Sequence, residues 1–143
     1  MKTALTSVLL GLLLAGPALG AELQGTLKKI KDTKTVTLGY RESSPPFSFA
    51  GVPGKPAGYS VDLCARIAAG IQRDLGLNGL QIRWVPVTVD TRLAAVANGT
   101  IDIECGSTTN TLSRQEQVDF SYQTFVDGGS LLATAASGIR GVA

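Results

Sequence analysis

Histidine is absent from the whole 143-residue chain. Its absence excludes a Ser-His-Asp triad and a zinc site with histidine ligands, and it removes the side chain that most often acts as a general base. Clusters of like charge are also missing, because the charged residues are spread along the chain and the formal net charge is only +2. We therefore expect no nucleic-acid-binding patch, no basic membrane-binding patch and no metal or other cofactor.

An apolar run long enough to cross a bilayer is missing too, since a membrane-spanning helix needs about 20 such residues. The run from Ala4 to Ala15 is shorter, follows Lys2 and is broken by Gly16-Pro17. Small residues at Ala18 and Gly20 are typical of a signal peptidase site. We predict a signal peptide over residues 1–20, with export to the periplasm. No cysteine follows the run, so a lipid anchor is not expected.

Cysteine is scarce: Cys64 and Cys105 are the only two. In an exported protein they can form one disulfide. Two buried free thiols are an equally acceptable interpretation, because the sequence cannot show whether the Cα atoms come within about 7 Å of each other.

Strand and helix patterns alternate along the chain. We predict strands over 35–40, 81–85 and 101–105, and helices over 22–32, from a cap at Ser60 to about 75, over 90–97 and over 112–117. This order predicts an α/β fold with a parallel sheet flanked by helices. We expect a long loop over 41–58 and further extended segments over 120–126 and 130–135. Leu131 and Leu132 have no later element to cover them, so we expect the chain to be truncated.

Three arginines follow successive predicted strands. Ligands of open α/β sheets bind beyond the carboxyl ends of the strands, where Arg41, Arg92 and Arg114 are expected to meet. Three guanidinium groups in one cleft would repel each other unless an anion joined them, and arginine matches a carboxylate with two parallel hydrogen bonds. The loop before Arg114 adds hydroxyl groups and backbone N–H groups near a helix start. Its hydroxyl-bearing candidates are Ser107, Thr108 and Thr109.

Two other sets of side chains near these loops leave alternatives open. Phe47 can form an aromatic floor for the aliphatic part of a ligand, or fold onto the core. Asp102 and Glu104 have the same-face spacing of a strand, but Asp102 more plausibly shapes the preceding turn. We therefore predict no catalytic residue.

Four ordered motifs resemble the family 3 bacterial solute-binding proteins, and within them the glutamate/aspartate-binding proteins of ABC importers. The motifs extend from Gly39 to Phe47, from Gly58 to Leu63, from Asn98 to Asp102 and from Glu104 to Asn110. One departure is Val89, which stands where a hydroxyl is expected in glutamate/aspartate binders. The resemblance therefore leaves the exact ligand open.

The resemblance implies a type II periplasmic-binding-protein fold of two lobes that close on a ligand about a hinge. It implies that Arg114, Ser107 and Thr109 hold the α-carboxylate and α-ammonium region of an amino acid, and that Arg41 and Arg92 hold a side-chain carboxylate. Residues 21–136 would form the first lobe and 137–143 a hinge or linker stub. Without the second lobe we expect weak or absent binding.

The leading hypothesis is a monomeric binding protein that delivers an amino acid to an ABC importer permease and has no enzymatic activity. The alternative is an exported enzyme on the same fold, similar to cyclohexadienyl dehydratase. A sensor or cell-wall-enzyme module that uses the fold is a third interpretation, which a longer gene with extra domains would favour.

Overall fold

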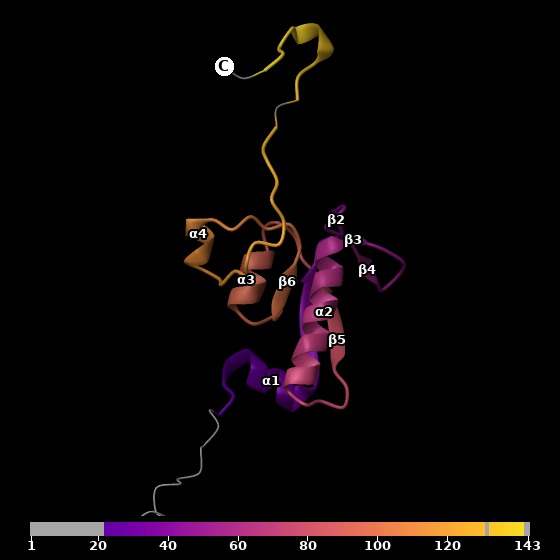
Figure 1. The fold of residues 1–143 in the computed structure, drawn as a ribbon, viewed down its shortest axis with the longest axis vertical. Helices are drawn as coiled ribbons and strands as arrows, with labels where there is room; N and C mark the ends of the chain where they lie inside the picture. Colours follow the sequence, from indigo (N-terminus) through magenta and orange to yellow (C-terminus); the bar gives the residue numbers. More distant parts are fainter. Residues whose placement is uncertain (1–21, 131, 142–143) are drawn as a thin grey trace, which may run out of the picture.

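A three-stranded parallel sheet forms the centre of the structure, a computed structural model that describes residues 22–130 and 132–141 (Figure 1). The strand order is β5-β1-β6. The bounds are Thr35–Tyr40 for β1, Gln81–Pro86 for β5 and Ile103–Cys105 for β6. All pairs are parallel, with Leu38 opposite both Trp84 and Ile103. The predicted α/β class is therefore confirmed, whereas the predicted signal peptide lies outside the described residues.

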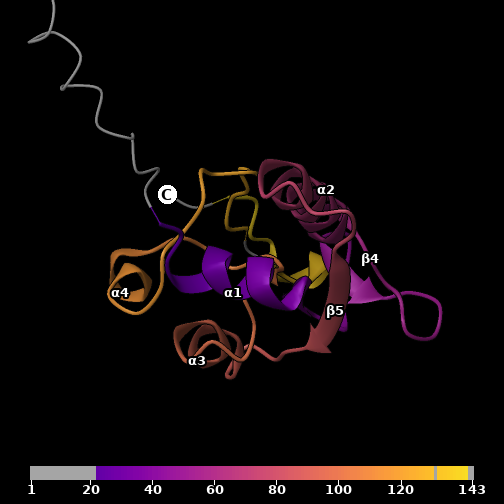
Figure 2. The same cartoon turned by 90° about the horizontal axis from the view of Figure 1, so that it is seen from below.

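Helices cover both faces of this sheet (Figure 2). Their bounds are Gly25–Thr33 for α1, Tyr59–Asp74 for α2, Arg92–Ala97 for α3 and Leu112–Gln115 for α4, and a short 3-10 helix, η1, spans Ala135–Ser137. Val36 and Leu38 of β1 point to the face where α1 and α2 contribute Ile30, Cys64 and Ala68. A second cluster on the α3 side contains Val87, Ala95 and Ile101. This alternation of buried side chains along β1 places one helical layer on each side of the sheet.

We predicted a long loop over residues 41–58, but this stretch forms a small antiparallel sheet. Its strands are β2 (Ser43–Ser44), β3 (Ser48–Ala50) and β4 (Pro56–Ala57), in the order β2-β3-β4. The prediction missed them because strands of two or three residues carry no readable alternation. This sheet holds Phe47 near the start of α2, where Ser60 N–H donates to the Phe47 carbonyl at 2.9 Å.

Helix α2 begins two residues earlier than predicted, and Ser60 does not cap it. The residue that precedes the helix is Gly58, with φ at 125°, a conformation that favours glycine. A Cβ at this position would also collide with the carbonyl group of Phe47. Ser60 lies inside the helix, and its hydroxyl donates to the Gly106 carbonyl at 2.7 Å. The helix is thereby tied to the loop that follows β6.

The predicted extended segments over 120–126 and 130–135 do not form strands. Residues 120–130 are irregular and pair with no strand in the described part of the chain. Residue 131 lies outside the described residues, and Ala135 belongs to η1. Local β propensity is not enough for a strand, because backbone groups also need a partner edge.

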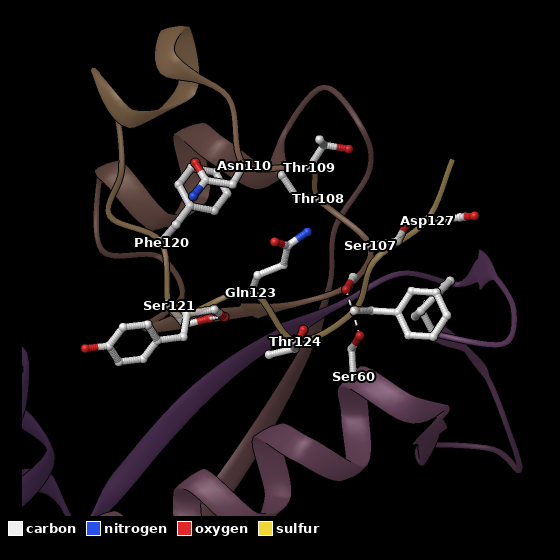
Figure 3. A pocket seen from close by; sticks show the side chains of 14 residues that line it. Ser60, Ser107, Thr108, Thr109, Asn110, Phe120, Ser121, Gln123, Thr124 and Asp127 are labelled. Carbon is white, nitrogen blue, oxygen red and sulfur yellow. Dashed lines mark hydrogen bonds between the residues drawn. The ribbon is translucent and has the colours of Figure 1, made fainter. Parts of the chain in front are cut away.

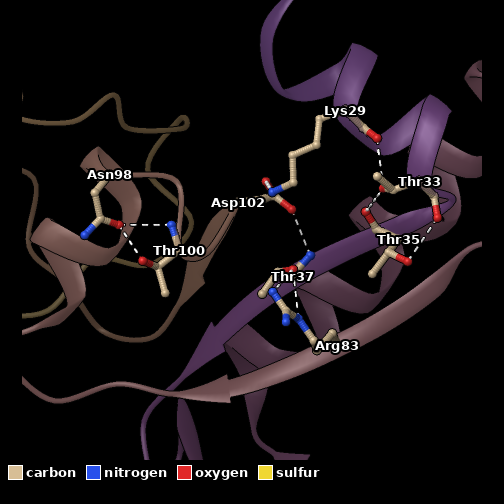
Figure 4. A network of polar contacts seen from close by, with 8 residues as sticks. All are labelled: Lys29, Thr33, Thr35, Thr37, Arg83, Asn98, Thr100 and Asp102. Carbon is tan, nitrogen blue, oxygen red and sulfur yellow. Dashed lines mark hydrogen bonds and ion pairs between the residues drawn. The ribbon is translucent and has the colours of Figure 1, made fainter.

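Asp102 connects three elements at the end of the sheet away from the loops just described (Figure 4). One carboxylate oxygen lies 2.7 Å from Lys29 Nζ of α1, and the other accepts the Thr37 N–H of β1 at 2.8 Å. The Asp102 N–H donates to the Thr37 carbonyl at 2.7 Å. Asp102 therefore fixes the entry into β6 through α1 and β1, whereas the preceding turn is held by Asn98, whose side-chain oxygen accepts from Thr100.

A disulfide joins Cys64 of α2 to Cys105, the last residue of β6, with the two Cα atoms 6.1 Å apart. Both residues are buried in the main core. The bridge therefore fixes the helix to the end of the strand that leads into the Gly106–Asn110 loop. Among the helices of the described residues, none is long and apolar enough to cross a membrane.

Candidate functional site

Arg92 is a buried cation at the first position of α3, with only 7% of its surface exposed. The turn before it is closed by Thr88 and Thr91, each of which donates its N–H to the hydroxyl of the other, at 3.0 and 3.2 Å. Such reciprocal bonds favour a helix start directly after Thr91. The hydrogen bonds between Thr88 and Thr91 therefore fix the backbone directly before Arg92, whose side chain is buried.

The charges of the three predicted arginines act on one another. Burial lowers the pKa of Arg92, and the positive charges of Arg41 and Arg114 lower it further. The carboxylates of Glu104 and Asp90 oppose this change. The structure therefore gathers Arg41, Arg92 and Arg114 into one positively charged region, which we call the arginine cluster.

The arginine cluster holds an unused donor. Arg92 Nε is buried and has no hydrogen-bond partner. A buried donor without an acceptor costs about 1–3 kcal/mol, and more when the group is charged. An anionic ligand that supplied the missing acceptor would remove this cost, so the cluster is suited to bind a carboxylate.

Arg114 has a second role in the loop that precedes it. Its Nη1 donates to the carbonyl of Thr109 at 2.8 Å. The neighbouring Gln115 amide donates to the Asn110 side chain at 2.8 Å. These bonds hold the Gly106–Asn110 loop in shape, so Arg114 is placed beside the hydroxyl groups of that loop.

A pocket of about 420 Å³ lies beside this loop (Figure 3). The predicted residues Phe47, Ser107, Thr108 and Thr109 line it, and Thr108 Oγ1 is buried without a partner. The three arginines are not among the lining residues. The lining also includes Ser60, Gly106, Asn110, residues 120–125 and Asp127.

Gly106 connects the pocket to the arginine cluster. It lines the pocket, and a Cβ built on it would lie 3.2 Å from Arg41 Cγ and would overlap Glu104 Oε1. The absence of a side chain at this position leaves room for both neighbours. The predicted residues thus form two adjoining groups, hydroxyls in the pocket and guanidiniums beside it.

One wall of the pocket comes from a segment that the sequence interpretation did not assign to the site. The Tyr59 hydroxyl donates to the Thr124 carbonyl at 2.8 Å. The ring of Phe125 packs edge-on against Phe47 and Tyr59, with centroid separations of 4.9 and 6.0 Å. Figure 3 shows Gln123 of this segment directed toward the side of the pocket formed by Thr108 and Thr109. No local sequence pattern signals this wall, because it depends on contacts between distant residues.

Glu104 is the other residue whose place in the site was missed. It lies in β6 opposite Gly39 of β1. Burial raises the pKa of its carboxyl group, and the nearby Thr108 hydroxyl, followed by the charges of Arg92 and Arg41, counteracts only part of that change. The sequence shows that Glu104 is a charged residue in the strand before the Gly106–Asn110 loop, which could have marked it as a candidate. The alternation along the strand does not show which residues the side chain faces.

Comparison with known proteins finds relatives that match most of the chain. The family model "Bacterial extracellular solute-binding proteins, family 3" matches residues 36–139. The L-glutamate/L-aspartate-binding protein of Pseudomonas aeruginosa is 48% identical over 137 residues, which is 95% of this chain and 45% of that protein. The glutamate/aspartate import solute-binding protein of Escherichia coli is 40% identical over 126 residues, or 88% and 40% of the two chains. The chain thus spans less than half the length of these relatives.

Solved structures show a similar fold. An ancestral amino acid-binding protein, a precursor of cyclohexadienyl dehydratase, matches with a TM-score of 0.60 and 30% identity, covering 69% of this chain and 41% of that one. A mutant of domain 1 from TmArgBP, in its arginine-bound form, matches with a TM-score of 0.58 and 30% identity, covering 72% and 74% of the two chains. The second match shows that a domain of comparable extent folds by itself and holds an amino acid.

Proposed function

Because the chain belongs to the bacterial extracellular solute-binding proteins of family 3, we propose that it is the ligand-binding lobe of a protein that captures glutamate or aspartate for an ABC importer. The single observation that carries this proposal is the buried Arg92, whose Nε lacks an acceptor and which lies near Arg41 and Arg114. A ligand with two carboxylates neutralises such a cluster better than a ligand with one.

Each predicted residue has a role in this proposal. Arg114, Ser107 and Thr109 hold the α-carboxylate and the region of the α-ammonium group. Arg41 and Arg92 hold the side-chain carboxylate. Thr108 offers a hydroxyl group, and Phe47 supports the aliphatic part of the ligand. Gly106 lines the pocket and borders Arg41, and this position next to both groups supports a ligand that contacts the hydroxyls and the guanidiniums together.

The relatives favour an acidic ligand over a basic one. The two curated relatives named above bind or import glutamate and aspartate, whereas the TmArgBP domain holds arginine. A cationic side chain would meet three guanidinium groups in this chain, and like charges at close range repel each other. We therefore place this chain with the binders of acidic amino acids.

The setting of the protein follows from the same proposal. We propose an extracytoplasmic, periplasmic protein with a cleavable signal peptide over residues 1–20, a lobe over 21–136 and a hinge or linker over 137–143. It would act as a monomer and deliver its ligand to a membrane permease. The descriptions of two relatives as import solute-binding proteins support the delivery role.

The alternative function is that of a dehydratase, and the observations favour binding without enzymatic activity. An ancestral cyclohexadienyl dehydratase matches with a TM-score of 0.59 and 26% identity. In this chain the carboxyl with a raised pKa is Glu104, as a general acid would need. Glu104 does not line the pocket, however, and two arginines face it instead.

The proposal is tested by titrating the isotopically labelled chain with amino acids and following its backbone amide signals. Glutamate and aspartate at millimolar concentration should shift the signals of Gly106–Asn110 and Arg92, while glutamine and arginine should act only at higher concentration. The arginine-bound TmArgBP domain supports measurable binding by one lobe. Preference for arginine would overturn the acidic ligand, and no response to any amino acid would overturn the proposed site.

A further inference from the structure

We propose that Glu104 is a positioning residue of the site, and that its carboxylate is the permanent negative charge that holds the guanidinium groups of Arg41 and Arg92 together between binding events. The proposal rests on the function proposed above. It adds a role for a residue that does not line the pocket.

Glu104 lies on β6, a different element from those that carry Arg41 and Arg92. Glu104 is paired with Gly39 in the sheet, and Arg41 lies two residues after Gly39, directly beyond the end of β1. Arg92 starts α3, and α3 packs against β6. The carboxylate oxygen Oε1 and Arg41 Cγ both border Gly106. Glu104 is therefore placed between the two guanidinium-bearing segments.

The interaction is electrostatic rather than a direct bond. Glu104 Oε1 is buried and accepts no hydrogen bond, and Arg92 Nε is equally without a partner. Among the charged neighbours of Arg92, Glu104 is the one that most strongly offsets the lowering of the Arg92 pKa by burial. The negative charge thus favours the charged form of a guanidinium that burial disfavours.

Keeping this charge is unfavourable for Glu104 itself. Burial raises the pKa of Glu104 even though Arg92 and Arg41 pull it down. A neutral side chain of the same shape would avoid that cost, since an uncharged group is easier to bury. The carboxylate is therefore better explained by what it does for the arginines than by its effect on the fold.

The charge also sets what the cluster can neutralise. The carboxylates of Glu104 and Asp90 offset part of the charge of the three guanidinium groups, and the cluster keeps a net positive charge that an anionic ligand neutralises. With Arg41 and Arg92 held in place, the ligand meets ordered donors and loses less binding free energy to ordering side chains. The loss of Glu104 would leave the arginines to repel each other and separate.

The test compares Glu104→Gln, which keeps the shape and removes the charge, with the wild-type chain. We expect the affinity for glutamate at neutral pH to fall at least about tenfold while the melting temperature stays the same or rises. Glu104→Asp, which keeps the charge on a shorter side chain, should recover part of the affinity. The matched control is Glu116→Gln, because Glu116 is exposed, and it should bind as the wild type does.

The pH profile separates positioning from a merely structural role. The charged groups that face Glu104 are Arg41 at the end of β1 and Arg92 in α3, while α2 contributes Cys64, which is disulfide-bonded and does not titrate. Protonation of Glu104 would remove its charge, so wild-type affinity should weaken as the pH is lowered toward about 5. That limit keeps the ligand's own carboxylates charged. Glu104→Gln should show a flat profile over the same range.

The outcomes also distinguish this proposal from the proposed function. If wild type binds glutamate or aspartate and Glu104→Gln binds equally well, the positioning role is overturned and the proposed function stands. If the variant loses affinity and melting temperature together, and Glu104→Asp recovers neither, Glu104 serves only the fold and the proposal is also overturned. If wild type binds neither amino acid, both proposals fall.

Discussion

The carboxylate of Asp102 lies 2.7 Å from the ammonium group of Lys29, although the two residues are 73 positions apart. The Asp102 side chain is only 3% exposed, whereas that of Lys29 is 43% exposed. Because the second carboxylate oxygen accepts the Thr37 N–H, one buried side chain joins α1, β1 and the entry to β6. Most of its contribution should come from the hydrogen bond to Thr37 rather than from the half-exposed ion pair.

Replacing Asp102 with Ala should lower the free energy of unfolding by about 2 kcal/mol, because the Thr37 N–H would lose its acceptor. Lys29→Ala should cost less than about 1 kcal/mol, as exposed ion pairs usually do. Urea denaturation followed by circular dichroism measures both changes. Lys28→Ala, which removes the exposed pair with Asp32, is the control. A larger loss for Lys29→Ala than for Asp102→Ala would contradict this ranking.

Removing the disulfide by a Cys64→Ala, Cys105→Ala double substitution should destabilise the fold by about 2–4 kcal/mol. The bridge closes a loop with a sequence separation of 41, and opening it gives the unfolded chain more conformations. Treatment of the wild type with a reductant should lower its urea midpoint to about that of the double variant. The midpoint of the double variant should not change with reductant. Equal midpoints for oxidised and reduced wild type would show that the bridge does not contribute.

The raised pKa of Glu104 predicts a pH dependence of stability. The folded chain holds a proton on Glu104 above the ordinary value of 4.5, where the unfolded chain has released it. Stability falls with rising pH when the folded state binds more protons. The free energy of unfolding of the wild type, relative to Glu104→Gln, should therefore decrease from pH 4.5 up through the raised pKa. A difference that does not vary with pH would contradict the burial of this carboxyl.

In the protein completed with its second lobe, Arg114→Ala should cost several kcal/mol of binding free energy for glutamate, because a buried carboxylate would lose its charged partner. The loop should loosen as well, since the bond to the Thr109 carbonyl disappears. Calorimetric titration measures the affinity, and amide exchange measures the loop. Arg73→Ala is the control, because Arg73 is exposed at the end of α2. Unchanged affinity would remove Arg114 from the site.

Two substitutions should loosen the pocket wall formed by residues 120–127 to different degrees. Tyr59→Phe removes the bond to the Thr124 carbonyl and should cost about 1 kcal/mol of local stability. Phe125→Ala removes the edge-on packing with Phe47 as well and should cost more. The amide NMR signals of residues 121–127 should move toward the positions of a disordered chain in that order, while those of β1 stay in place. Equal signals in all three proteins would show that the segment is held by other contacts.

Two strands of the parallel sheet, β1 and β5, could be predicted because each has six residues, enough to display a pattern. The third, β6, has three residues and was predicted over 101–105, two residues too long at its start. Strand β1 was predicted with its observed bounds, Thr35–Tyr40. The predicted range for β5 was one residue shorter than the observed strand. The three short strands between Ser43 and Ala57 could not be found, because each has only two or three residues. Pairing across a hairpin, not propensity, creates them.

The site was predictable only in its charges. The rule about strand ends placed Arg41, Arg92 and Arg114 in one region, where their charges influence each other. The rule could not show that Arg92 is buried, or that Glu104 lies between two arginines, because both depend on the register of β6 against β1. The wall formed by residues 120–127 depends on contacts with Phe47 and Tyr59 that span more than 60 positions.

The bond between Cys64 and Cys105 links oxidation to assembly of the site. Cys105 is followed directly by Gly106, and the Gly106 carbonyl is held by Ser60 on the same helix that carries Cys64. A freshly made chain in a reducing compartment would lack this clamp, and the loop that carries Ser107 and Thr109 would be less firmly seated on α2. Under the function proposed above, the loop would therefore be fully seated for binding only once the two thiols had been oxidised.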